Sequence, residues 1–563
     1  MFINVAIIPI IYYDYYTKGG LMCGILAVIG STSESEVEFI KAQSKKLSLR
    51  GPDESGSFVS DKGVLCHERL SIIDLHSGKQ PIISDSYALI HNGEIYNHMN
   101  LRSEIGHEKF STKSDSESIL FGYEKWGEEV VHKLDGVFAF VILHEDGFIA
   151  GRDPIGVKPL FYGRDDQGRL WFASEYKALI ESCIEIHEFL PGHVMTQKDF
   201  SPRRWFFPDW YRGIEVKAGP ERIKDAFIQA VEKRLMSDVS IAALLSGGLD
   251  SSLVASIAAK ALAKEGKKLF TYSVGLEGSP DLAKARDVAE FIGSVHHEIV
   301  YTVEEGLDHV EELIGKIESY DVTTIRASTP MSLVAGRIKA DGHKVVLSGE
   351  GADELFGGYL YFAHAPSATD FHFECLRRVK RLHTSDVLRA DRSSAGNSLE
   401  ARVPFLDLKF LQVAMELDAE YKVLTPEKRE KYILRKAFDD GTYLPSEVLW
   451  RQKEQFSDGV GYSWVDGLKD LADRKISDAE FSRAAEIFPH NTPMTKEAFF
   501  YRKIYTSHFP HESVDKLVKR WIPKWQEYNI DPSGRANKLH EQTTETSDVS
   551  EAIKKAPDAI AIC

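Results

Sequence analysis

A change in hydrophobic pattern near residue 220 constrains the fold of this chain more than any other feature. Beyond it, helical periodicity at 221–235, 251–262 and 281–292 alternates with strand-length apolar runs at 240–245, 269–274 and 344–347. Parallel strands need crossover connections of about helix length, so this alternation predicts a parallel sheet with helices on both faces. We therefore expect an α/β doubly wound domain over residues 221–534, with a mostly helical C-terminal part.

The preceding segment, 23–207, has a different pattern. Short apolar runs at 24–30, 87–90, 137–143 and 148–151 are bounded by Gly, Asp or Asn and predict strands. Helical stretches are few, with candidates at 36–47 and 116–126. This segment is expected to be a sheet-dominated domain. A stretch rich in Pro and aromatic residues follows it, and we place a linker at 208–220.

Composition narrows the class of protein. With 563 residues, 43% hydrophobic and 27% charged, the chain is long enough for two or three globular domains. A formal net charge of −16 repels phosphate backbones and argues against a nucleic-acid partner. The five cysteines are scattered and form no C-x-x-C pair, which indicates a reducing, cytoplasmic location without disulfides or structural zinc.

The two ends of the chain are unlike the rest. Residues 1–22 are apolar and aromatic but interrupted by Asn4 and Pro9, and no Lys or Arg precedes the apolar run. The run lacks the features of a secretory signal and is shorter than the roughly 20 residues of a membrane helix, so no membrane partner is expected. We expect this extension to be removed, or translation to start at Met22. The Thr-, Ser- and Glu-rich tail, 535–563, is predicted to be disordered.

Cys23 is the first candidate catalytic residue, because it follows Met22 directly. If that methionine is removed, Cys23 carries a free α-amine with a pKa near 8, which can act as the base for its own thiol. The small Gly24 leaves room for a substrate carbonyl. The alternative is a Cys-Gly pair that simply opens a strand.

Three further sites carry both a functional and a structural interpretation. Arg69, among apolar residues, could bind a ligand carboxylate or form an internal salt bridge. Asn92-Gly93 could form an oxyanion hole, or the turn of a β-hairpin. Asp115 could hold a substrate ammonium or cap a helix.

With Arg50-Gly-Pro-Asp53 and Gly151-Arg-Asp-Pro154, these segments resemble the glutaminase domain of class II, N-terminal-nucleophile amidotransferases. The resemblance implies an α+β domain of layered antiparallel sheets with helices, in which Cys23 is the nucleophile. It implies that Arg69 binds the glutamine carboxylate and that Asn92 and Gly93 form the oxyanion hole. It also assigns the ammonium to Glu94 and Asp115, and the pocket lining to the backbone of Leu70, Ser71, Ile72 and Ile73.

A second candidate site begins with Leu244-Leu-Ser-Gly-Gly-Leu-Asp-Ser-Ser252, which ends a predicted strand and opens a predicted helix. Gly247 and Gly248 let the backbone wrap an anion, and the serines and the helix N-terminus supply donors. Asp250 could reach Mg²⁺ held by phosphates. No Lys follows the glycines, so the string is not a Walker A loop. The alternative is an ordinary Gly-rich turn between strand and helix.

Acidic residues follow the next predicted strand, in Ser348-Gly-Glu-Gly-Ala-Asp-Glu-Leu-Phe-Gly-Gly358. Parallel sheets bind ligands at this end of their strands. Glu350 is a candidate base and Asp353 a second Mg²⁺ ligand, although either could instead cap a helix. Lys453 could neutralise charge on a phosphate during transfer, or be a solvated surface lysine.

The order of these motifs over residues 23–540 resembles the glutamine-hydrolysing asparagine synthetases, and the Leu244–Ser252 string resembles the pyrophosphate loop of ATP-pyrophosphatases. The resemblance implies that aspartate and ATP give β-aspartyl-AMP and pyrophosphate, and that ammonia from glutamine arrives through an internal tunnel. It implies Mg²⁺ with ATP, no organic prosthetic group, and a homodimer. It assigns ATP contacts to Leu245, Ser246, Gly247, Gly248, Asp250, Ser251, Val274, Ser348 and Gly349, and aspartate contacts to Thr323, Thr324 and Arg326.

Other functions remain open at this point. β-Lactam synthetases share the architecture but lack the cysteine, and phosphoribosyl-transferring amidotransferases lack the Leu244–Ser252 loop. If residues 1–22 stay attached, the nitrogen of Cys23 is an amide without a basic lone pair. Such a protein is expected to keep ammonia-dependent synthesis and to lose glutamine hydrolysis.

Overall fold

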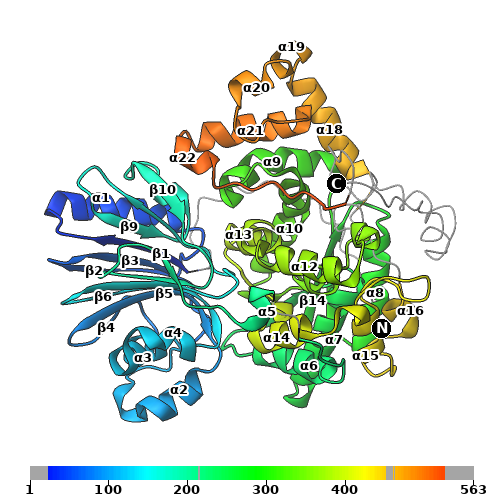
Figure 1. Cartoon of the computed structure of the whole chain (residues 1–563), viewed down its shortest axis with the longest axis horizontal. Helices are drawn as coiled ribbons and strands as arrows, with labels where there is room; N and C mark the ends of the chain where they lie inside the picture. Colours follow the sequence, from blue (N-terminus) through cyan, green and yellow to red (C-terminus); the bar gives the residue numbers. More distant parts are fainter. Residues whose placement is uncertain (1–22, 214–215, 452–460, 462, 526–563) are drawn as a thin grey trace.

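The computed structural model describes residues 23–213, 216–451, 461 and 463–525. Within these residues, the N-terminal half forms two antiparallel six-stranded sheets, which Figure 1 shows stacked face to face. One sheet has the order β10-β8-β9-β1-β3-β2 and the other β12-β11-β7-β6-β5-β4. The strands are β1 (Gly24–Ile29), β2 (Glu54–Ser60), β3 (Gly63–Arg69), β4 (Ile82–Ile83), β5 (Tyr87–Ile95), β6 (Gly136–His144), β7 (Gly147–Arg152), β8 (Phe161–Arg164), β9 (Leu170–Ala173), β10 (Glu185–Glu188), β11 (His193–Thr196) and β12 (Arg203–Arg204).

The apolar run of strand β1 is unbroken because both faces of the strand are covered. Ile25 and Ala27 point into the core between the two sheets, whereas Leu26 and Val28 belong to the core on the opposite face. Successive side chains of a strand point to opposite faces, so a strand covered on both sides needs apolar residues throughout. Helix α1 (Glu34–Ser44) packs on the outer face of the first sheet. Helices α2 (His98–Ile105), α3 (Glu117–Trp126) and α4 (Val130–Lys133) cover the second.

The C-terminal half is built on a parallel sheet with the order β15-β14-β13-β16-β17. Its strands are β13 (Ile241–Leu244), β14 (Phe270–Gly275), β15 (Val295–Val300), β16 (Val345–Leu347) and β17 (Glu400–Arg402). The helices around it include α6 (Ile223–Lys233), α7 (Leu249–Lys264), α8 (Pro280–Ile292), α9 (Val303–Ile317), α10 (Val322–Ala340), α11 (Ala352–Phe356), α12 (Ala368–Val379), α13 (Asp386–Ala395) and α14 (Leu408–Glu416).

Helices also dominate the remainder of the described chain. They are α5 (Asp209–Arg212) between the halves, then α15 (Tyr432–Ala437), α16 (Ser446–Leu449), α18 (Ser463–Lys475), α19 (Asp478–Phe481), α20 (Ala484–Ile487), α21 (Lys496–His508) and α22 (Glu512–Asp515). In Figure 1 α19, α20 and α21 stand above α9 at the top of the molecule, with α22 to its left and α18 to its right.

The predicted fold class is confirmed: an α+β domain of layered antiparallel sheets precedes an α/β domain with a parallel sheet. The domain boundaries at 22, 207, 220 and 534 stay predictions, and those made for residues 1–22 and 535–563 lie outside the described residues. Among the described residues, no helix is long and apolar enough to cross a bilayer.

Candidate active sites

Cys23 lies at the start of β1, beside the backbone that follows β3. The N–H of Leu70 donates to Cys23 Sγ at 3.3 Å. Burial raises the pKa of the Cys23 thiol to about 12, and the Leu70 N–H only partly opposes that rise. A thiol in this position holds its proton at neutral pH. It therefore becomes a nucleophile only where a nearby base removes that proton.

Asn92 and Gly93 lie inside β5, paired with Ala139 and Phe138 of β6, so the hairpin-turn interpretation is wrong. The amide of Asn92 is 1% exposed, and neither its oxygen nor its nitrogen has a hydrogen-bond partner among the described residues. Gly93 has φ +142°, and a Cβ there would lie 1.9 Å from Val137 O. This position requires glycine, and the neighbouring amide is a buried donor available to a ligand.

The predicted carboxylate- and ammonium-binding residues flank these groups. Arg69 ends β3 and donates to Glu54 Oε2 at 3.2 Å and to Asp74 O at 2.6 Å, so the internal salt bridge exists. Asp115 does not cap α3, because its Oδ2 accepts the N–H of Ile95 at 2.7 Å. Burial raises the pKa of Asp115 to about 6, while that N–H lowers it.

Glu94 points toward the other half of the protein. Its Oε1 lies 3.1 Å from a guanidinium nitrogen of Arg402, on β17. Burial raises the pKa of the Glu94 carboxyl, and Arg402 opposes the rise. The four residues from Leu70 to Ile73 follow β3, and the N–H of Ser71 donates to Asp53 Oδ2 at 3.0 Å. The glutaminase-type residues therefore gather at the ends of β1, β3 and β5.

A cavity of about 180 Å³ marks the second site, at the carboxyl ends of β13, β14 and β16. Parallel sheets place ligands at this edge. Of the predicted residues, Leu245, Ser246, Gly248, Asp250, Ser251, Val274, Thr323, Ser348, Gly349, Glu350 and Asp353 line it.

The loop before α7 has the form expected of an anion cradle. Ser251 Oγ accepts the N–H of Ser246 at 3.1 Å and lies 3.0 Å from Ser246 Oγ, so the loop closes on itself. Gly247 has φ +71°, and a Cβ there would lie 2.5 Å from Lys284 atoms. Gly248 caps the N-terminus of α7, and the first residues of this helix line the cavity.

Charged residues that the motifs do not contain complete this cavity. Lys431 forms ion pairs with Asp250 and with Asp353, the latter at 2.6 Å. Burial lowers the pKa of Lys431, but the two carboxylates raise it by more, so the net shift is upward. Glu350 pairs with Arg389 at 2.7 Å, and burial nevertheless raises the pKa of the Glu350 carboxyl. Sequence reasoning missed Lys431 and Arg389, and no local motif marks either of them.

Of the three residues predicted to face aspartate, the structure places one in the wall of the cavity. Thr323 lines the cavity, whereas Thr324 Oγ1 donates to Asp321 Oδ2 at 2.9 Å at the start of α10. Arg326 forms a bidentate pair with the buried Glu497, at 2.8 and 2.6 Å. Neither Thr324 nor Arg326 is among the described residues that line the cavity. Lys453 lies outside the described residues.

Taken together, a cysteine site on stacked antiparallel sheets and a Ser-Gly-Gly loop on a parallel sheet define a two-domain amidotransferase. Models of two protein families match the chain: a glutamine amidotransferase domain over residues 22–204, and an asparagine synthase over residues 222–374 and 363–531. The chain belongs to the glutamine-hydrolysing asparagine synthetase family.

Curated relatives agree along nearly the whole length. A probable glutamine-hydrolysing asparagine synthetase of Dictyostelium discoideum is 48% identical over 562 residues, covering 93% of this chain and 100% of the relative. Glutamine-hydrolysing asparagine synthetase 2 of Arabidopsis thaliana is 47% identical, over 96% of this chain and 99% of the relative. Asparagine synthetase 3 of the same plant is 48% identical, over 92% and 94%.

Proposed function

We propose that this protein makes asparagine from aspartate, with ATP as the activating nucleotide and glutamine as the nitrogen donor, at two separate sites. The observation that carries the proposal is the presence of both sites in one chain that matches its relatives over more than 90% of its length. The thiol of Cys23 attacks the glutamine amide, and its thioester is then hydrolysed to glutamate. The ammonia released moves through the protein to the second site.

In the first site the residues divide the work as follows. The free α-amine of Cys23 takes the thiol proton, which the buried thiol does not release unaided at neutral pH. The side-chain amide of Asn92 and the N–H of Gly93 donate to the oxyanion. Arg69 binds the glutamine carboxylate, and Asp115 and Glu94 bind its ammonium.

In the second site the loop from Ser246 to Ser251 holds the phosphates, and an aspartate carboxylate oxygen attacks the α-phosphorus. Pyrophosphate leaves, and ammonia then attacks the β-aspartyl-AMP carbonyl to give asparagine and AMP. Glu350 lies in the cavity beside Arg389 and takes a proton from the attacking nitrogen. Lys453 balances phosphate charge. Thr323 contacts aspartate from the cavity wall.

The residues present fit a magnesium ion. Asp250 Oδ1 is buried without a hydrogen-bond partner among the described residues, and Asp250 and Asp353 converge on one Lys431 ammonium. Mg²⁺ is usually held by one or two carboxylates together with substrate phosphates. When bound, the ion neutralises charge on the leaving pyrophosphate. Asp250 and Asp353 would hold it, with Lys431 beside them. We also propose a homodimer in the cytoplasm, by likeness to the family.

One experiment tests both halves. The intact mass of the purified protein identifies its first residue, and glutamate release is measured beside aspartate-dependent pyrophosphate release. A chain that begins at Cys23 is expected to hydrolyse glutamine, and Cys23→Ser to lose this while keeping ammonia-dependent synthesis. A chain that retains residues 1–22 and still hydrolyses glutamine would contradict the free-amine mechanism. Absence of aspartate-dependent pyrophosphate release would contradict the second site.

A further inference from the structure

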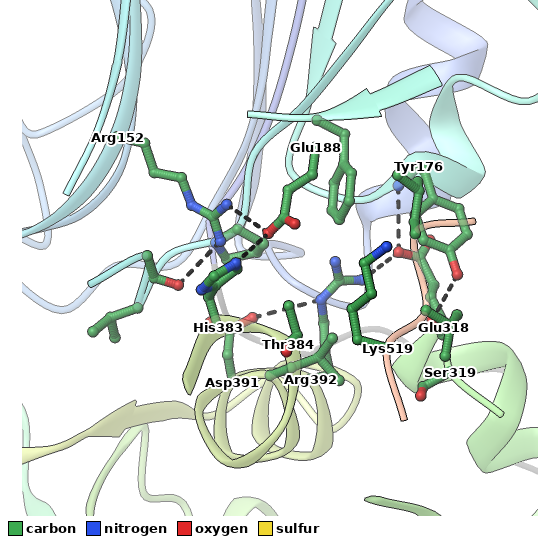
Figure 2. Close-up of a pocket in the computed structure, with 17 residues that line it drawn as sticks. Arg152, Tyr176, Glu188, Glu318, Ser319, His383, Thr384, Asp391, Arg392 and Lys519 are labelled. Atoms are coloured by element: carbon green, nitrogen blue, oxygen red, sulfur yellow. Dashed lines mark hydrogen bonds and ion pairs between the residues drawn. The ribbon is translucent and has the colours of Figure 1, made fainter. Parts of the chain in front are cut away.

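We infer that Asp391, from the synthetase domain, is a positioning residue for Cys23 in the glutaminase domain. Asp391 lies on α13, where Figure 2 shows it next to Arg392, on the helix that faces the strands of the N-terminal domain. Its side chain is 4% exposed and receives a guanidinium fork from Arg50. The distances are 2.8 Å from Arg50 Nη1 to Asp391 Oδ2 and 3.1 Å from Nη2 to Oδ1.

Arg50 carries the effect across the domain boundary to the nucleophile. Its remaining nitrogen, Nε, donates to the carbonyl oxygen of Cys23 at 3.1 Å. The guanidinium is planar and rigid, so a carboxylate that fixes two of its nitrogens also fixes the direction of the third. Asp391 thereby sets the position of the Cys23 backbone through Arg50, without contacting Cys23.

Glu175 is the other anion beside Arg50, but it is shared. Its Oε1 lies 2.8 Å from Arg50 Nη1 and 3.4 Å from Arg392 Nη1, and its Oε2 lies 2.7 Å from Lys177. Asp391 makes the only fork-to-fork contact with Arg50 that the described residues contain, and its other cation, Arg392, stands 3.9 Å away. Glu175 therefore retains Arg50 in the interface, while Asp391 orients it.

The geometry of Cys23 depends on few contacts. In the described chain the backbone of Leu70 contacts the sulfur and Arg50 holds the carbonyl, so loss of the fork removes one of the constraints on the position of Cys23. A misplacement of about 1 Å in a reacting group can cost about 100-fold in rate. Because Glu175 remains, we expect Asp391→Asn to reduce the kcat for glutamine hydrolysis about tenfold. The KM for glutamine should stay within about twofold, since Arg69 and Asp115 are untouched.

The matched control is Glu318→Gln, the same loss of one carboxylate at the same domain boundary. Glu318 pairs with Arg392 and accepts from the N–H of Lys177, and among the described residues it makes no hydrogen bond or ion pair with Arg50. It should leave kcat for glutamine hydrolysis within about twofold. Ammonia-dependent synthesis, measured as pyrophosphate release from ATP and aspartate, should stay within about twofold in both variants, which separates positioning from damage to the fold.

This inference rests on the proposed role of Cys23. The measurements distinguish failure of that role from failure of the inference. A wild-type chain that starts at Cys23 but hydrolyses no glutamine would overturn both. An active wild type with an unchanged kcat in Asp391→Asn would overturn the inference alone. It would also be overturned if both variants lost kcat equally, or if ammonia-dependent synthesis fell with glutamine hydrolysis.

Discussion

Lys422 is a buried cation whose removal should stabilise the protein. It follows a short helical turn (Ala419–Tyr421), is 1% exposed, and its Nζ has no hydrogen-bond partner among the described residues. Its Nζ lies 5.7 Å from the centroid of the Phe356 ring, a cation–π contact. Burial lowers the pKa of Lys422 from 10.5 to about 8, and the nearby Cys375 only partly opposes this. Charging this amine is therefore less favourable in the folded state than in the unfolded chain.

The magnitude follows from that shift. Each unit of pKa is worth about 1.4 kcal/mol, so the charged amine costs the folded state about 3 kcal/mol at pH 7. Methionine has a similar length and no charge, so Lys422→Met should raise the free energy of unfolding by about 2–3 kcal/mol at pH 7. Between pH 8 and pH 10.5 the unfolded chain holds a proton that the folded chain has lost, so wild-type stability rises there. The advantage of the variant should disappear over the same window.

Urea unfolding followed by tryptophan fluorescence, at pH 7 and at pH 10, measures both effects. Lys268→Met is the control, because Lys268 is exposed and its removal should change stability by less than about 0.5 kcal/mol. A Lys422→Met variant less stable than wild type at pH 7 would refute the reasoning. So would a gain of equal size at both pH values, since burial of charge could not then be its cause.

Three further outcomes are expected. As pH falls through about 6, Asp115 gains a proton and the KM for glutamine should rise several-fold, and steady-state kinetics of Asp115→Asn should show no such dependence. Gly93→Ala puts a Cβ 1.9 Å from Val137 O, so glutamine hydrolysis should fall at least about 100-fold while ammonia-dependent synthesis persists. Glu497→Gln removes one carboxylate that pairs with buried Arg326 and should lower the free energy of unfolding by about 2 kcal/mol, with an unchanged KM for aspartate. A raised KM would instead favour contact between Arg326 and aspartate.

Sequence predicted strands that contain a long apolar run and are covered on both faces, whereas β3, β9 and β11 are also buried throughout and were not predicted. The runs at 24–30 and 137–143 became β1 and β6, with their side chains divided between two cores. Strand β15 was not predicted, since Val-His-His-Glu-Ile-Val is half-exposed at the edge of its sheet and is defined by pairing with β14. Strand β17 has only three residues and depends on β16 in the same way.

In the candidate sites, too, sequence predicted the residues of local motifs and missed those that only the fold brings together. Residues in contiguous strings, such as Ser246 to Ser251, were recognisable because a turn, a helix start and an anion cradle are local features. Lys431 and Arg389 were not, because each acts on an acidic residue far away in sequence: Asp250 for Lys431, and Glu350 for Arg389. Only the folded chain brings these charges together, and no spacing rule anticipates them.

Ion pairs across the domain boundary affect the charge of a residue proposed to bind glutamine. Arg402, from the synthetase domain, pairs with Glu94 at 3.1 Å and with Glu400 at 2.8 Å, and Glu400 pairs with Lys158 of the glutaminase domain at 3.0 Å. Each domain thus neutralises a buried charge of the other, and removing one member of such a pair costs about 3–5 kcal/mol. Burial raises the pKa of Glu94, as do the charges of Glu400 and Asp115, whereas Arg402 opposes the rise. Loss of Arg402 would raise the pKa of Glu94 further, so the domain that uses the ammonia favours the charged form of the carboxylate proposed to hold the glutamine ammonium.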